Sequence, residues 1–165
     1  MTDNVFEVAK NMELEGEEFY KKLADETAID ELKGVFHFLA EQEKEHFTFF
    51  EYMQEEKTST YQQTKNAITA AKEAFKKITP NFKAPDSPEA VESAYTNAVN
   101  LEKNSIAYYT SLLNTIDEDE QKQALQWIIE EEKKHQIIME SMVEFITAPK
   151  QWIENAEFNL LDEFE

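Results

Sequence analysis

Apolar residues recur every three or four positions in four long stretches of the chain, the spacing that places them on one face of an α-helix. The stretches begin near Val5, Leu32 and Val91 and, for the fourth, after Asp117 or Asp119. The break between the first two, around residues 25–30, is short enough to predict an antiparallel helix pair. The pattern therefore predicts an all-α protein.

Residues that favour helix ends support these limits. Thr2 or Asp3 is predicted to cap the first helix, and Asp117 or Asp119 the fourth, which should end near residue 148. Before the third helix, a capping hydroxyl precedes Pro88, a residue that fits the first helical position.

The whole chain, residues 1–165, is predicted to form one domain with a hairpin at 3–56, a crossover at 57–87, a second hairpin at 88–148 and a tail at 149–165. Part of the crossover is expected to be a short helix crossing the bundle, because apolar residues keep helical spacing there. They are Tyr61, Ile68, Ala71, Phe75 and Ile78. The tail is amphipathic, with Trp152 among its apolar residues, and is expected to pack on the bundle or on a second subunit, in a homodimer.

Charged residues interrupt the apolar faces at matched positions. Glu132 and His135 lie three residues apart on the apolar side of the fourth helix, and so share one helix face. An unpaired charge in a core is heavily penalised, so such a pair needs a partner. A metal ion would provide one.

The same residues recur at a constant separation of 89 positions. The matched pairs are Glu13 with Glu102, Tyr20 with Tyr109, Glu43 with Glu132, and His46 with His135. The histidine and tyrosine matches are informative because the chain has only 3 His and 6 Tyr. The chain is therefore interpreted as a duplicated helical hairpin, which forms a four-helix bundle with one long crossover.

Composition limits the kind of site. There is no cysteine, so disulfides, thiolate nucleophiles and cysteine-bound metals are excluded. A net charge of -19 disfavours nucleic acid and anionic membrane surfaces and favours cations. The N-terminus lacks a signal-peptide pattern, and a cytoplasmic location is expected.

Folding the repeat would gather four carboxylates and two imidazoles, which suits two divalent ions. The predicted ligands are Glu13, Glu43, His46, Glu102, Glu132 and His135. Two of the glutamates are expected to bridge the ions, and oxygen and nitrogen ligands favour iron or manganese, with zinc also compatible. Without metal, crowding should raise carboxylate pKa values or loosen the site. Tyr20 and Tyr109 are expected to hydrogen-bond the carboxylates, although ordinary buried tyrosines are an alternative.

These motifs, Glu13-x6-Tyr20, Glu43-x2-His46, Glu102-x6-Tyr109 and Glu132-x2-His135, resemble those of the ferritin-like superfamily of diiron-carboxylate proteins, and most closely its rubrerythrin branch. The resemblance implies a ferritin-like bundle and a non-haem dinuclear iron centre that reacts with hydrogen peroxide or dioxygen. Rubrerythrins usually carry a cysteine-ligated rubredoxin module. Without cysteine, this chain should need a separate electron-donor protein.

Three functions remain open at this point: an oxidoreductase that reduces peroxide or dioxygen, a ferroxidase or iron-storage protein, and a non-catalytic bundle stabilised by metal. Two residue-level questions also remain. Gly16 and its equivalent Ser105 leave space either for a small oxidant or for close helix packing. His37 lacks a repeat partner and is expected at the surface or beside the site, not as a ligand.

Overall fold

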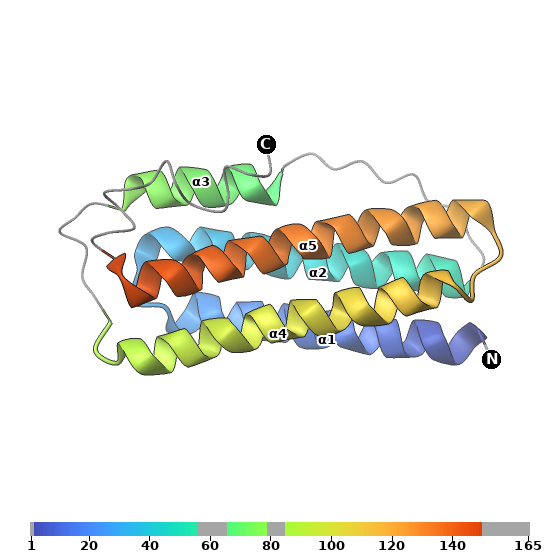
Figure 1. Cartoon of the computed structure of the whole chain (residues 1–165), viewed down its shortest axis with the longest axis horizontal. Helices are drawn as coiled ribbons and strands as arrows, with labels where there is room; N and C mark the ends of the chain where they lie inside the picture. The colour runs from blue at the N-terminus through green and yellow to red at the C-terminus, as the bar shows by residue number, and fades with distance from the viewer. Residues whose placement is uncertain (1, 56–65, 79–84, 150–165) are drawn as a thin grey trace.

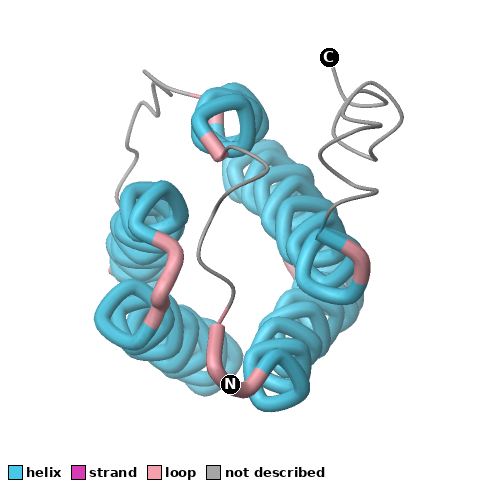
Figure 2. The backbone as a smooth tube through the Cα atoms, turned by 90° about the vertical axis from the view of Figure 1, so that its left-hand side faces the viewer, coloured by secondary structure: helices cyan, strands magenta, loops and turns pink. Residues whose placement is uncertain are grey.

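The computed structural model describes residues 2–55, 66–78 and 85–149, with side chains from residue 5 onward. Four long helices lie side by side along the length of the molecule, and a fifth, shorter one lies outside them (Figures 1 and 2). The helices are α1 (Thr2–Glu26), α2 (Asp30–Gln54), α3 (Ala67–Lys77), α4 (Pro88–Leu113) and α5 (Asp119–Thr147). The predicted all-α bundle is confirmed.

The long helices form two antiparallel hairpins, α1 with α2 and α4 with α5, which pack against each other. Helices α2 and α4 run in the same direction, and α3, which lies between them in the sequence, runs back along the length of the bundle (Figure 1). Each hairpin turn buries one isoleucine, Ile29 at 3% exposure and Ile116 at 4%. These side chains close the two ends of the bundle with apolar surface.

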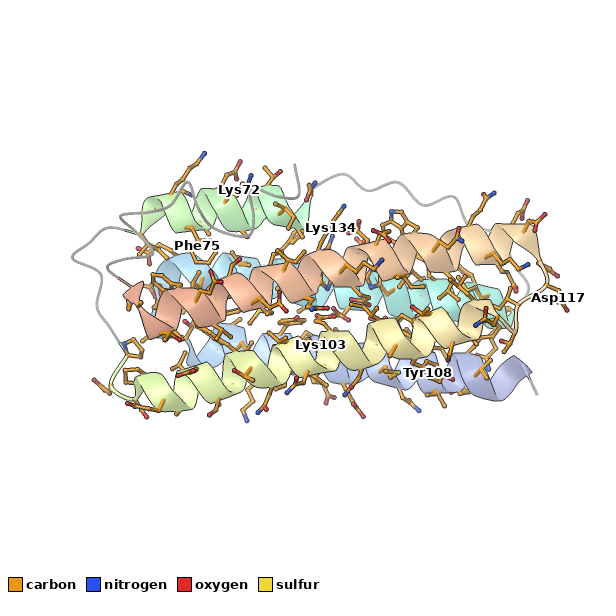
Figure 3. All side chains as sticks on the ribbon, viewed as in Figure 1. Lys72, Phe75, Lys103, Tyr108, Asp117 and Lys134 are labelled. Carbon is orange, nitrogen blue, oxygen red and sulfur yellow. The ribbon has the colours of Figure 1, made fainter. Side chains whose placement is uncertain are left out.

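Helix α3 is the short helix predicted within the crossover. It lies lengthwise on α2 and α5, not across the bundle (Figure 1). Phe75 points from α3 toward the bundle (Figure 3) and meets Phe145 of α5 with ring centroids 5.8 Å apart. Asn66 caps the helix by accepting a hydrogen bond from the Ile68 amide at 2.8 Å. Tyr61 and the tail from residue 150 lie outside the described residues.

The predicted helix caps are partly wrong. Pro88 opens α4 as expected, but the Ser87 side chain makes no capping hydrogen bond. Helix α5 starts at Asp119, and the residue before it, Glu118, also gives no side-chain cap. Asp119 and Glu120 instead lie in the first turn, where negative charge favours the positive end of the helix dipole. Helix α1 already includes Thr2, so Asp3 lies inside it.

A buried polar layer divides the core into two apolar clusters. One cluster contains Leu39 of α2 and Met139 of α5, and the other contains Phe50 of α2 and Ile128 of α5. On each long helix the predicted metal ligands fall between residues of these two clusters. The fold thus places the charged residues at mid-length, away from both ends.

Candidate metal centre

Each long helix contributes to the polar layer. Helices α1 and α4 each supply one glutamate, and α2 and α5 each supply a Glu-x-x-His pair, so all six predicted ligands come together. Their exposed fractions are between 0% and 3%. The residues are Glu13, Glu43, His46, Glu102, Glu132 and His135.

The six residues form two overlapping groups of four. In each group, one possible ligand atom per residue lies within 4.8 Å of the others. Glu13 and His46 belong to the first group only, and Glu102 and His135 to the second only. Glu43 and Glu132 belong to both. Carboxylates shared in this way are placed to bridge two ions.

Both imidazoles present Nδ1 to the carboxylates. Nδ1 of His135 lies 2.8 Å from Glu43 Oε1 and 3.2 Å from Glu132 Oε2. Nδ1 of His46 lies 3.1 Å from Glu132 Oε1 and 3.5 Å from Glu13 Oε2. The two rings stack with centroids 5.8 Å apart. In each group of four, Nδ1 is thus the histidine nitrogen available to an ion that the carboxylates also bind.

Two buried tyrosines join the hairpins through the carboxylates. Tyr20 of α1 donates a hydrogen bond to Glu102 of α4. Tyr109 of α4 donates one to Glu13 Oε1 of α1 at 2.5 Å. The hydrogen bonds expected from the sequence are present, and each crosses to the opposite hairpin. Such contacts fix the orientation of a metal-binding carboxylate.

Burial and crowding shift the protonation of the cluster. Burial, together with the charges of Glu132 and Glu13, raises the pKa of Glu43 well above its ordinary value. Burial and the Glu132 charge raise the pKa of Glu102 to about 7. Burial alone would lower the pKa of His135, but the neighbouring carboxylates, Glu102 first, raise it to about 10. Protons on the glutamates and histidines therefore offset the negative charge of the carboxylates, a role that metal ions could also fill.

Glu13 and Glu102 each belong to one group only and are called the terminal carboxylates; Glu13 differs from Glu102 in its protonation. Burial would raise its pKa, but hydrogen bonding with Glu43 and the charge of His46 outweigh burial and lower it. Its Oε2 atom is fully buried and makes no hydrogen bond within the described residues. An ionised, buried oxygen whose contact with His46 Nδ1 is as long as 3.5 Å is suited to a cation. The donor set as a whole fits iron, manganese or zinc.

Gly16 lies directly beside the shared Glu43. A Cβ atom at this position would meet Glu43 Oε2 at 2.8 Å, closer than such atoms normally approach. The space at Gly16 is therefore occupied by the Glu43 carboxylate, which favours the close-packing alternative over the oxidant-access hypothesis. His37 is exposed, as expected.

Three further residues at the centre were missed by sequence reasoning. Gln42 and Glu131, which precede the two shared glutamates, are buried at 3% and 1% exposure. They are also 89 positions apart, and this repeat match was the available signal. Trp127 meets the His46 ring edge-on, with centroids 5.6 Å apart.

Comparison with a known structure supports the fold. A crystal structure from Thermotoga maritima, described as that of a ferritin-like diiron-carboxylate protein, superimposes with a TM-score of 0.62. Its sequence is 23% identical, and the match covers 90% of this chain and 95% of that one. The fold is thus ferritin-like.

The sequence assigns the family. The rubrerythrin family model matches residues 4–153, nearly the whole chain. The chain belongs to the rubrerythrin family. A search of curated proteins gave no significant match. Among the described residues, no helix combines the length and apolar character needed to cross a membrane.

Proposed function

We propose that the protein is an oxidoreductase that uses two iron ions to reduce hydrogen peroxide or dioxygen. The observation that carries the proposal is the pair of buried four-residue groups sharing Glu43 and Glu132. A site for a single ion would not need two imidazoles and two shared carboxylates. Membership of the rubrerythrin family supports iron as the metal.

The residues have distinct roles in this proposal. Glu43 and Glu132 would bridge the ions, while Glu13 and Glu102 would each bind one. Four carboxylates balance the charge of two divalent ions. Two bound ferrous ions would supply two electrons, which with two protons convert hydrogen peroxide into two waters or dioxygen into hydrogen peroxide. A separate donor protein must then return the electrons, because the chain has no cysteine-bound iron of its own.

The hydroxyl groups of Tyr20 and Tyr109 remain protonated. Burial, followed by the charges of nearby glutamates, raises the pKa of both Tyr20 and Tyr109 well above the ordinary value. Each hydroxyl therefore remains a donor to its carboxylate at neutral pH. The apolar clusters on both sides of the site limit the entry of water.

The test is to prepare the diferrous protein anaerobically, mix it with hydrogen peroxide or with dioxygen, and follow the absorbance by stopped flow. Rapid oxidation by peroxide or dioxygen and multiple turnovers with an added reductant are expected. Glu132→Ala should abolish the reaction, whereas Gln121→Leu, in the first turn of α5 and away from the site, should not. A slow response to both oxidants would contradict the proposal.

The same protein samples distinguish this proposal from the two alternative functions, a ferroxidase or iron-storage protein and a non-catalytic bundle. A ferroxidase would consume ferrous iron as substrate, and storage would require a large closed shell in solution scattering, where a dimer is expected. A non-catalytic bundle would be stabilised equally by zinc and iron and would show no oxidant chemistry.

A further inference from the structure

The residues preceding the two shared glutamates occupy equivalent repeat positions but make different contacts. Gln42 of α2 contacts a ligand histidine, since its Oε1 lies 2.6 Å from His135 Nε2. Glu131 of α5 instead accepts hydrogen bonds from Lys134 Nζ at 3.0 Å and from Gln42 Nε2 at 3.5 Å. Lys134 reaches the surface of α5 (Figure 3) with a side chain 25% exposed.

This chain of contacts fixes the orientation of His135. A carboxylate such as Glu131 accepts hydrogen bonds, so the Gln42 group facing it is the NH₂ group. The carbonyl oxygen of Gln42 therefore faces His135, and it can only accept. Nε2 of His135 must carry a hydrogen, which leaves Nδ1 as the nitrogen for a metal ion.

The other histidine has no such support. His46 Nε2 is buried and makes no hydrogen bond to any residue that the structure describes. Its ring instead meets the edge of Trp127, with centroids 5.6 Å apart. Glu131, at the repeat position equivalent to Gln42, is engaged by Lys134 and Gln42.

We propose that the two metal positions are inequivalent and that Gln42 makes the position of Glu102 and His135 the first to fill. Gln42 is a positioning residue: it orients a ligand without contacting the ion. A ligand already held in its binding orientation loses less freedom on binding than a free one. This inference rests on the proposed metal centre and adds an order of loading to it.

The order can be read directly from the histidines. The full-length metal-free protein, labelled with ¹⁵N in its histidine rings, is titrated with zinc and followed by NMR. The chain has only 3 His, and the exposed His37 serves as an internal reference. We expect His135 to shift with the first equivalent and His46 with the second. In the zinc-loaded protein, His135 should carry its hydrogen on Nε2.

Gln42→Leu keeps a side chain of similar bulk but removes the acceptor. The first zinc ion should then bind about 10- to 100-fold more weakly, the usual effect of losing a residue that orients a ligand. The two histidines should shift together. Glu131→Gln, a nearly isosteric change, should weaken the same ion less, because the Gln42 amide can then turn over.

Gln121→Leu is the matched control. It removes an amide hydrogen bond to the Met53 carbonyl, at 3.2 Å, away from the site, and should leave the loading order unchanged. If both histidines shift together in the unaltered protein, or if neither Gln42→Leu nor Glu131→Gln changes the first ion, the inference is wrong although the metal centre stands. If zinc shifts neither His46 nor His135, the metal centre itself is wrong.

Discussion

The two hairpins supply the same donors but surround them differently. Each gives one glutamate and one Glu-x-x-His pair, 89 positions apart in the sequence. Beside these donors, Gly16 in the first hairpin is matched by Ser105, and Gln42 is matched by Glu131. The repeat thus determines which atoms could reach metal ions, while the unmatched neighbours determine how each of these side chains is held.

The largest effect should come from the residues that the halves share. Glu132→Ala removes a carboxylate from both groups of four, whereas Glu13→Ala removes one from a single group. We expect Glu132→Ala to abolish tight binding of both zinc ions, and Glu13→Ala to leave one ion bound. Calorimetric titration with zinc measures both stoichiometries. Loss of both ions in Glu13→Ala would show that the two groups do not function separately.

A smaller effect should distinguish Gly16 from Ser105. Gly16→Ala places a methyl group 2.8 Å from Glu43 Oε2, so the shared carboxylate must move. We expect zinc affinity to fall about 10- to 100-fold, as when a ligand loses its orientation. Ser105→Ala, which removes an atom instead of adding one, should change affinity little.

Far-ultraviolet circular dichroism of both variants is the control for folding. Equal effects of Gly16→Ala and Ser105→Ala on the zinc affinity would contradict the asymmetry between the hairpins.

The sequence predicted the fold and which buried carboxylates and imidazoles come together for one reason: both depend on spacing. Glu43 and His46 share a face because of helix geometry, and the offset to Glu132 and His135 identified their partners. Capping by Ser87 and Asp119 was wrong because the flanking backbone decides whether a side chain can reach an amide.

Contacts between helices could not be predicted in the same way. The space beside Gly16 was open to two interpretations, because only the packed structure shows that the Glu43 side chain enters it. The contact of Gln42 with His135 joins α2 to α5 and depends on how the hairpins are aligned.

The two terminal carboxylates should affect the metal-free protein in opposite directions. The pKa of Glu102 is raised to about 7 in the folded state, so its carboxyl destabilises the fold increasingly as pH rises from about 4.5 to 7. Glu102→Gln should therefore stabilise the metal-free protein at pH 8, by about 1 to 3 kcal/mol at 1.36 kcal/mol per pKa unit.

Glu13 has a lowered pKa, so its charge contributes stability above the unfolded pKa that is lost as pH falls. Glu13→Gln should therefore destabilise the metal-free protein at pH 8. Urea unfolding in the presence of a chelator, at pH 5 and pH 8, measures both effects. Effects of the same sign for the two variants at pH 8 would contradict the assigned protonation states.

The two tyrosines should give the smallest difference between the halves. Tyr20 and Tyr109 each donate to a terminal carboxylate of the opposite hairpin, and both are almost fully buried. Replacing either with Phe leaves a buried carboxylate without one donor, which costs about 1 to 3 kcal/mol. We therefore expect Tyr20→Phe and Tyr109→Phe to lower the free energy of unfolding of the zinc-loaded protein by similar amounts.

Tyr108→Phe, which removes a hydrogen bond to the Val5 carbonyl outside the site, is the control. A much larger loss in one variant than in the other would extend the asymmetry of the histidines to the carboxylates, whereas equal losses would confine it to Gln42 and Gly16.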